Sequence, residues 1–293
     1  KPAAIPEWQR RNGTVEIKTP YYVMELAEDA GGAITRAWSP VTQKPLWKGI
    51  SNDLVSYCDL GGLWRMVHEV WGGKFKELHR ASERLAQLKV RELEGGLEVA
   101  CVTELDGQTM QRLMWFRSDS PVIRLRVEGL AAERRTVTVR FDTDVSASRL
   151  VMDAVGGVVA RPPQRMYNPT FWPLQHFVHL QDDASGRGLA LCLGMPGAAS
   201  YRRDGRLEAI ALRNATCERA FGLFPLLGLP AVGHERASHT FDYAILFTPA
   251  GDWRENGIPL VAQSIPNNPW DTTGHAELRA LAASAVTTNS PEV

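Results

Sequence analysis

The sequence contains no apolar run that approaches the ~20 residues needed to span a bilayer. It also has no excess of either charge, because 33 Lys+Arg residues balance 33 Asp+Glu residues. Without a net positive charge, the chain has no field that would attract nucleic acid or an acidic membrane surface. These absences predict a soluble globular protein that binds neither, and 293 residues suffice for one large domain or two smaller ones.

Cysteine is scarce, and the four cysteines are far apart and form no Cys-x-x-Cys pair: Cys58, Cys101, Cys192 and Cys217. Three of them lie in apolar, strand-like surroundings, which is typical of buried free thiols in a reducing compartment. The chain also opens without the charged and apolar segments of a secretory signal. We therefore expect a cytoplasmic location, with any N-terminal signal lying outside this chain.

The common catalytic and metal-binding motifs are missing as well. There is no His-Glu-x-x-His, no Cys/His zinc spacing, no Gly-x-Ser-x-Gly and no P-loop or dinucleotide fingerprint. His176 and His179 are three apart on a predicted strand, so they point to opposite faces and cannot hold a metal together. Asp142 and Asp144 share a strand face at roughly 6–7 Å, as glycosidase carboxylates can, but we favour two solvated carboxylates at a strand end. We predict no metal site and no catalytic residue in this chain.

Alternation of apolar and polar residues is abundant, and it predicts β-strands. The spacing is roughly ten residues, and Gly, Asp-Gly or Pro separates the runs, which favours an antiparallel sandwich over βαβ units. The predicted strands are residues 13–18, 21–26, 33–38, 87–93, 97–105, 108–117, 122–127, 136–141, 177–181, 188–193, 207–212 and the strand through Phe241. Residues 277–285 are the one good helix candidate. We therefore expect an all-β domain over residues 1–275, followed by a short helix and frayed tail over 276–293.

A chemically dense stretch covers residues 52–75, where glycine pairs separate aromatic and charged residues. Sugars are bound by aromatic faces and by planar charged groups, and this stretch offers both in Trp64, Arg65, His68 and Glu69. The alternative is a long loop that caps the sandwich, with Trp64 and Trp71 in the core and an Arg65–Glu69 ion pair. Both interpretations remain open.

The stretch over residues 239–269 combines a strand with a charged turn. Phe241, Tyr243, Ile245 and Phe247 alternate along the strand, and Asp252, Trp253 and Arg254 follow the break at 248–251. A strand that delivers an aromatic and charges onto a loop can form a sugar-facing rim. In the alternative, Trp253 plugs the end of the sandwich while Asp252 pairs with Arg254 or caps backbone groups.

The third candidate, residues 161–172, is rich in proline and aromatics and is predicted to be extended outside any strand ladder. Arg161, Tyr167, Phe171 and Trp172 could line a glycan groove or contact another domain. We favour the interdomain contact, because exposed aromatics near proline most often pack on a partner surface. Phe171 and Trp172 should then belong to an exposed apolar patch.

Several of these segments resemble glycoside hydrolase family 38 α-mannosidases. The closing segment H-x-F-x-Y-A followed by G-D-W-R-E is similar to the end of that family's chains. So are D-A-V-G-G-V-V-A-R-P at residues 153–162, and Q-H-F-V-H-L-Q-D at 175–182 with G-L-A-L at 188–191. Together with residues 22–38, the similar segments occur in the family's order over most of the chain.

The resemblance implies the large β-supersandwich that these enzymes share with galactose mutarotase. In the family, the nucleophile and the zinc-binding His and Asp residues lie in a preceding α/β barrel, whose motifs are not found here. In the family, the region that corresponds to residues 52–75 contributes a loop towards the barrel's sugar pocket. The chain starts at Lys1 without an initiator Met. We therefore expect the C-terminal sandwich domain of such an enzyme, inactive alone, with a mannoside-type glycan and the missing barrel as partners and zinc in that barrel.

Two alternatives from other functional classes remain. The chain could be an autonomous carbohydrate-binding module, or a mutarotase-like epimerase with a His general acid and a carboxylate base. The near-sequence candidates for such a pair are His68 with Glu69 and His239 with Asp242. Adjacent or i, i+3 residues on a strand diverge, which disfavours both pairs.

Overall fold

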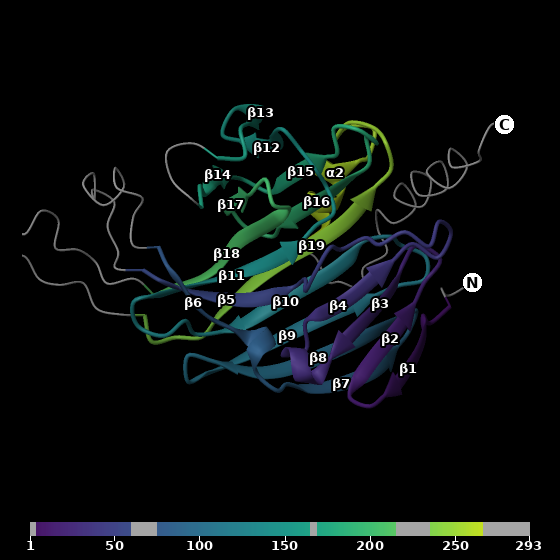
Figure 1. Cartoon of the computed structure of the whole chain (residues 1–293), viewed down its shortest axis with the longest axis vertical. Helices are drawn as coiled ribbons and strands as arrows, with labels where there is room; N and C mark the ends of the chain where they lie inside the picture. The colour runs from purple at the N-terminus through teal and green to yellow at the C-terminus, as the bar shows by residue number, and fades with distance from the viewer. Residues whose placement is uncertain (1–3, 60–74, 165–168, 215–234, 266–293) are drawn as a thin grey trace, which may run out of the picture.

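Antiparallel strands dominate the computed structural model, which describes residues 4–59, 75–164, 169–214 and 235–265 (Figure 1). A four-stranded sheet is formed by β1 (Glu7–Arg11), β2 (Thr14–Lys18), β3 (Val23–Ala27) and β4 (Ile34–Trp38). The turn at Asn12–Gly13 connects β1 to β2, and the short 3-10 helix η1 (Glu28–Ala30) lies between β3 and β4. Both residues of the turn have positive φ, as does Gly31 directly after η1. None of the helices in the described part of the chain is long and apolar enough to cross a membrane.

The largest sheet has nine strands in the order β13-β12-β15-β16-β19-β10-β9-β8-β7. Its strands are β7 (Gln87–Leu93), β8 (Gly96–Leu105), β9 (Gln108–Phe116), β10 (Ile123–Gly129), β12 (Leu150–Ala154), β13 (Gly157–Arg161), β15 (Phe177–Gln181), β16 (Gly188–Leu193) and β19 (His239–Thr248). The remaining six-stranded sheet has the order β14-β17-β18-β11-β5-β6. Its strands are β5 (Asp53–Cys58), β6 (Glu77–Arg80), β11 (Arg135–Asp142), β14 (Trp172–Leu174), β17 (Gly197–Tyr201) and β18 (Arg206–Asn214).

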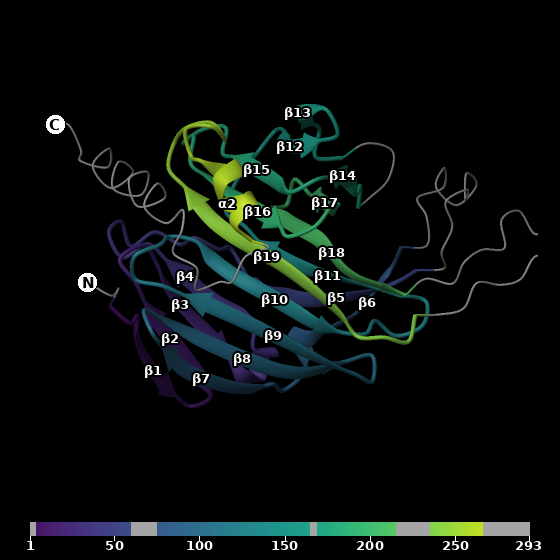
Figure 2. The same cartoon turned by 180° about the vertical axis from the view of Figure 1, so that it is seen from behind.

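One hydrophobic cluster joins the three sheets. It takes buried side chains from each of them, including Met24 of β3, Val139 of β11 and Ile245 of β19. The four-stranded and six-stranded sheets lie against the nine-stranded sheet, which is seen from its two sides in Figure 1 and Figure 2. Because side chains alternate along each strand, the same pattern that fills this core leaves a second face on every sheet.

The short helix α2 (Ile258–Ser264) covers part of the second face of the nine-stranded sheet. Ile258, Val261 and Ala262 pack there against a second cluster that contains Phe177 and Ala190. Pro259 in the first turn of α2 suits a position whose backbone N–H needs no intrahelical partner. This helix therefore fixes the course of the chain directly after the charged turn at residues 249–257.

The all-β antiparallel sandwich expected from the sequence is confirmed, as is each of the twelve predicted strands, to within a few residues at the ends. The alternative of one long capping loop over residues 52–75 is wrong for the first part of that stretch. Asp53–Cys58 forms β5, an interior strand that pairs with both β11 and β6. Leu54 faces the core, so burial of this face decides the conformation. The helix candidate at 277–285 lies outside the described residues, and so does the proposed boundary at 275.

Two smaller expectations have clear outcomes. Cys58, Cys101 and Cys192 are free thiols, and the last two are fully buried, whereas Cys217 lies outside the described residues. The segment expected outside any strand ladder does contribute to one. Its last residue, Trp172, begins β14, which pairs with β17 at the edge of the six-stranded sheet. An edge strand tolerates Pro173 because its partner lies on one side alone.

Candidate functional site

The charged turn predicted as a sugar-facing rim is built around the Asp252 carboxylate. This carboxylate accepts hydrogen bonds from the backbone N–H groups of Arg254 at 2.7 Å and Glu255 at 3.0 Å. It also pairs with the Arg254 guanidinium at 3.2 Å. Hydrogen bonds from the backbone, that of Glu255 first, lower the pKa of Asp252. The pairing and capping that we gave as the alternative are therefore present in the turn.

Trp253 is partly buried and packs on the cluster beneath α2. Its ring centroid lies 5.8 Å from that of Phe177, and the Arg254 guanidinium carbon lies 4.1 Å from its centroid on the ring face. The Arg254 side chain is nevertheless 69% exposed. Packing thus explains Trp253, while contact of this turn with a sugar stays a prediction.

The other half of the predicted rim, Trp64, Arg65, His68 and Glu69, lies outside the described residues. Its flanks can be placed by a series of hydrogen bonds that starts at Asp59. The Asp59 N–H donates to Arg134, the Arg134 N–H to Asn214, and the Asn214 side chain to Glu235. Glu235 pairs with His239, the first residue of β19. Asp252 comes four residues after Thr248, the last residue of β19, so Asp59 and the charged turn are connected to opposite ends of a ten-residue strand, roughly 33 Å long.

The predicted interdomain residues divide between core and surface. Trp172 is 9% exposed, belongs to the main core, and donates its indole N–H to the Pro162 carbonyl at 3.0 Å. The expectation that it forms part of an exposed apolar patch is therefore wrong. Arg161 lies over the Trp172 ring at 4.7 Å. Phe171 is half-buried and meets Phe75 edge-on at 5.4 Å. Tyr167 lies outside the described residues, and contact of Arg161 and Phe171 with another domain stays a prediction.

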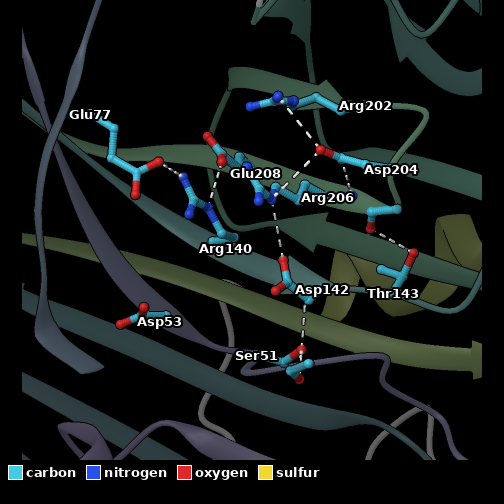
Figure 3. A network of polar contacts seen from close by, with 12 residues as sticks. Ser51, Asp53, Glu77, Arg140, Asp142, Thr143, Arg202, Asp204, Arg206 and Glu208 are labelled. Atoms are coloured by element: carbon cyan, nitrogen blue, oxygen red, sulfur yellow. Dashed lines mark hydrogen bonds and ion pairs between the residues drawn. The ribbon is translucent and has the colours of Figure 1, made fainter. Parts of the chain in front are cut away.

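The densest polar arrangement lies on the face of the six-stranded sheet that points away from the main core. Four side chains from adjacent strands stand opposite one another in register: Ser200 of β17, Glu208 of β18, Arg140 of β11 and Asp53 of β5. We name these four residues the polar row. Each is no more than 2% exposed, although the row contains three ionisable groups. Figure 3 shows Arg140 between Glu208 of the row and Glu77 of β6.

Arg140 connects the polar row to its neighbours. Its Nε donates to Glu208 at 2.6 Å, and its Nη2 donates to the Tyr57 hydroxyl and to Glu77, both at 2.6 Å. The Tyr57 hydroxyl donates in turn to Glu208 at 2.8 Å. The Arg140 Nη1 and the Ser200 hydroxyl are buried and have no hydrogen-bond partner among the residues that the structure describes. Because unpaired buried donors are costly, these two atoms are places where an acceptor from a ligand or a water would be stabilised.

Three groups of this arrangement have pKa values that the surroundings shift away from neutrality. Burial alone would raise the pKa of Glu77, but hydrogen bonds from Arg140 and Arg80 lower it to about 2. Burial also opposes the charge of Arg140, yet Glu208 and Glu77 raise its pKa overall. Burial, followed by the charge of Glu208, raises the pKa of Tyr57. None of these three groups titrates near pH 7, so Arg140, Glu77 and Tyr57 suit binding and positioning better than proton transfer. Burial raises the pKa of Asp53, the remaining carboxyl of the row at β5, although hydrogen bonds from Ser82 oppose this.

An aromatic wall borders the polar row on the side of β6. Tyr57 and Phe75 are stacked with ring centroids 4.5 Å apart, and the Phe171 ring contacts Phe75 edge-on. Aromatic faces beside hydrogen-bonding groups are the elements of a saccharide site. The sequence pattern did carry a signal for the row, because Arg140 and Glu208 interrupt strongly apolar strands at positions that alternate with core residues.

Other combinations of residues that were considered from the sequence do not form a site among the described residues. Within the described residues, no three His, Cys, Asp or Glu side chains converge as metal ligands, so they do not fit a zinc site. His239 pairs with Glu235 at 3.2 Å, whereas Asp242 forms a two-point contact with Arg126. The His239 and Asp242 pair considered for an epimerase is thus engaged elsewhere.

His179 lies in β15, whereas His176 precedes that strand, so the prediction that both histidines stand on one strand is wrong for His176. His176 is exposed and contacts Asp153 at 3.1 Å, whereas His179 is 2% exposed and its Nε2 lies 3.0 Å from the Thr248 hydroxyl. Burial lowers the pKa of His179 to about 4, and the nearby charge of Asp252 opposes that shift. His179 is therefore neutral in the folded chain down to a pH at which an unfolded histidine is charged.

We expect this burial to make the chain acid-sensitive. Below about pH 6.5 the unfolded state binds the proton first, so stability is lost as pH falls from 6.5 towards 4. Replacing His179 by Gln, which can keep the contact with Thr248, should remove up to about 3 kcal/mol of this pH dependence. Urea unfolding of both proteins at pH 7.0 and pH 4.5 measures the difference. Equal losses in the two proteins would show that His179 does not cause the sensitivity.

Comparison with known proteins places this fold. No protein-family model matches the sequence, and a search of curated proteins finds no match. Among solved structures, an α-mannosidase from Enterococcus faecalis V583 matches 88% of this chain with a TM-score of 0.65 and 12% identity. A protein of glycosyl hydrolase family 38 from Enterococcus faecalis matches the same share, with a TM-score of 0.66 and 12% identity.

The chain covers 32% and 33% of these two structures, so it spans about a third of their length. At 12% identity the likeness establishes the fold alone. The resemblance inferred from sequence segments is thereby confirmed as a shared architecture. This chain has the β-sandwich fold found within family 38 α-mannosidase structures.

Proposed function

We propose that this chain is the sandwich domain of an α-mannosidase-like glycoside hydrolase, and that it shapes the sugar-binding site without supplying the nucleophile or the zinc ligands. The observation that carries the proposal is the fold match over 88% of the chain to about a third of two such glycosidases. The remaining two thirds of those structures leave room for a separate catalytic barrel. In this proposal the barrel is the chain's partner, it holds the zinc, and the substrate is a mannoside-type glycan.

The polar face of the six-stranded sheet supports this role. Arg140 forms hydrogen bonds with both Glu77 and Glu208, and Tyr57 and Phe75 present stacked rings beside them. Such groups orient hydroxyls and sugar faces by hydrogen bonds and contact area, which requires no change of protonation. The predicted rim residues Asp252, Trp253 and Arg254 lie beside α2 on the nine-stranded sheet and would serve a separate surface. A rim on both ends of the sandwich would need a substrate or partner that reaches across it.

Of the alternatives, the autonomous carbohydrate-binding module remains compatible with the same face. The epimerase is disfavoured because His239 and Asp242 are each engaged with another residue. Binding of a neutral mannoside by the chain alone would be common to the hydrolase domain and the binding module. Hydrolysis by the natural protein distinguishes the two functions. A hydrolase domain works together with a catalytic barrel, whereas a binding module binds its glycan without one.

We expect the isolated chain to hold no stoichiometric zinc and to leave 4-nitrophenyl α-mannoside unhydrolysed, with or without added zinc. The reason is that tight zinc binding needs three or four converging ligands and that catalysis needs a nucleophile beside them. Elemental analysis after dialysis and a nitrophenol release assay measure both. One tightly held zinc per chain, or turnover above the buffer rate, would contradict the proposal that a separate barrel holds the zinc and the nucleophile.

A further inference from the structure

A pocket of about 460 Å³ lies beside β4 and the segment that follows it, away from the polar row and the charged turn. After Trp38 the chain reverses and runs back antiparallel to β4, with bridges from Trp38 to Pro45 and from Ile34 to Ser51. The Leu46 N–H donates to the Ala37 carbonyl at 2.9 Å, which fixes the two segments together. The volume is in the range of small-ligand sites.

The lining combines an aromatic surface with two cations. Arg36 and Trp38 stand on the same face of β4, and the Arg36 guanidinium carbon lies 5.1 Å from the Trp38 ring centroid. Stacking of this kind holds a guanidinium in place while leaving its edge accessible, and the Arg36 side chain is 69% exposed. Lys48 lies on the returning segment and also lines the pocket.

The charged residues that line this pocket are both positive, Arg36 and Lys48. Arg36 has one partner, Glu25, at a long 3.3 Å. In the part of the chain that the structure describes, the Lys48 ammonium has no ion-pair partner. Two cations and no carboxylate line the pocket; the nearby carboxylates of Glu25 and Asp142, the second of which lies beside Gly49, are outside the lining. Gln43 and Thr35 add uncharged hydrogen-bonding groups to the same lining.

We propose that this pocket binds an anionic monosaccharide unit, a pyranose that carries a carboxylate or a phosphate. The indole of Trp38 offers the apolar surface on which a pyranose ring packs, and Gln43 can bond its hydroxyls. Lys48 and Arg36 receive the negative group, with Arg36 exchanging its long contact to Glu25 for a charge-assisted bond to the ligand. A neutral sugar would leave Lys48 without a partner, and a free anion would leave the indole uncovered. The proposal does not depend on the mannosidase assignment, since none of the residues used belongs to the polar row or to the predicted rim.

Isothermal titration of the chain with four probes tests the proposal: methyl β-D-glucuronide, glucose 6-phosphate, methyl β-D-glucoside and inorganic phosphate. We expect at least one of the two charged sugars to bind about tenfold more tightly than the neutral glucoside and than phosphate, since each charge-assisted bond contributes about one decade. The preference between the two charged sugars identifies the carboxylate or the phosphate as the ligand group. Affinity should fall as salt rises, because the contacts are near the surface.

Lys48→Gln should weaken binding of the preferred charged sugar about tenfold and leave the glucoside unaffected. Lys44→Gln is the matched control, because Lys44 is an exposed lysine on the same hairpin that does not line the pocket. Trp38→Leu should weaken the charged sugar but not inorganic phosphate. Thermal unfolding confirms that each variant is folded. Equal affinity for charged and neutral sugars, or equal losses in the two lysine variants, would overturn the proposal.

Discussion

Replacing Arg140 by Met should destabilise the chain by about 3–5 kcal/mol, because it leaves the buried Glu208 carboxylate without the positive charge that compensates it. Glu208 is 1% exposed, and after the change its remaining partner is the Tyr57 hydroxyl. Urea unfolding followed by circular dichroism measures the effect. Adding Glu208→Met to the same chain should recover a large part of the loss, since a buried pair replaced by apolar residues is often tolerated.

Arg206→Gln is the control for the loss of a surface guanidinium. Arg206 lies 3.9 Å from Asp142 and 3.7 Å from Asp204, and its side chain is 33% exposed. An exposed pair of this kind contributes less than about 1 kcal/mol. Equal losses in the Arg140 and Arg206 variants would mean that the row is solvated in solution and that its burial is not energetically important.

Replacing Gly31 by Ala should be comparably damaging, with an expected loss of at least about 3 kcal/mol. Gly31 adopts a φ of 62° after η1, and a Cβ atom there would lie 2.0 Å from the Ala81 carbonyl oxygen of the neighbouring 3-10 helix η2 (Ala81–Glu83). A backbone atom cannot give way as a flexible side chain can. The Gly31 carbonyl also accepts a hydrogen bond from the fully buried Arg112, so a shift here would disturb the core.

Gly107→Ala is the matched control for this change. Gly107 has a φ of 74°, similar to that of Gly31, but a Cβ there would meet nothing within 4 Å. Its loss should therefore reflect backbone strain alone, about 1–2 kcal/mol. If both alanine variants unfold at the same urea concentration, the close approach of η1 to η2 does not contribute to stability.

The strands were readable from the sequence because their signals are local. Glycine pairs and Asp106-Gly107 mark the turns between alternating runs, and the structure has positive φ at Gly31, Gly32 and Gly107. The strand β5 was not predicted, because its outward positions carry Asp53 and Tyr57 and a stretch dense in polar residues is typical of a loop. Its inward side chains contact a core that the local pattern does not reveal.

The polar row could not be assembled from the sequence, because its members lie between residues 53 and 208 and meet through the register of four strands. Register is set by non-local pairing, and a shift of one residue would turn each side chain to the other face. The pairing of Asp252 with Arg254 is local, and the sequence did offer it as an alternative. Sequence reasoning therefore succeeds here at contacts within a turn and misses those between strands.

The proposed role also explains why no catalytic constellation was found among the described residues. A sandwich that orients a substrate needs charged groups whose protonation does not change, and Glu77, with a pKa near 2, has that property. The same reasoning places proton transfer and metal chemistry on the partner barrel. It makes the polar face, rather than the charged turn, the first place to look for an effect on mannoside affinity.

The most direct test is zinc content and turnover of the natural gene product that contains this chain. The account predicts a longer polypeptide with an α/β barrel ahead of Lys1, one zinc per chain by elemental analysis, and hydrolysis of 4-nitrophenyl α-mannoside that is lost on chelation and restored by zinc. A gene product that consists of this sandwich alone, or one with a preceding domain that neither holds zinc nor hydrolyses the mannoside, would contradict it.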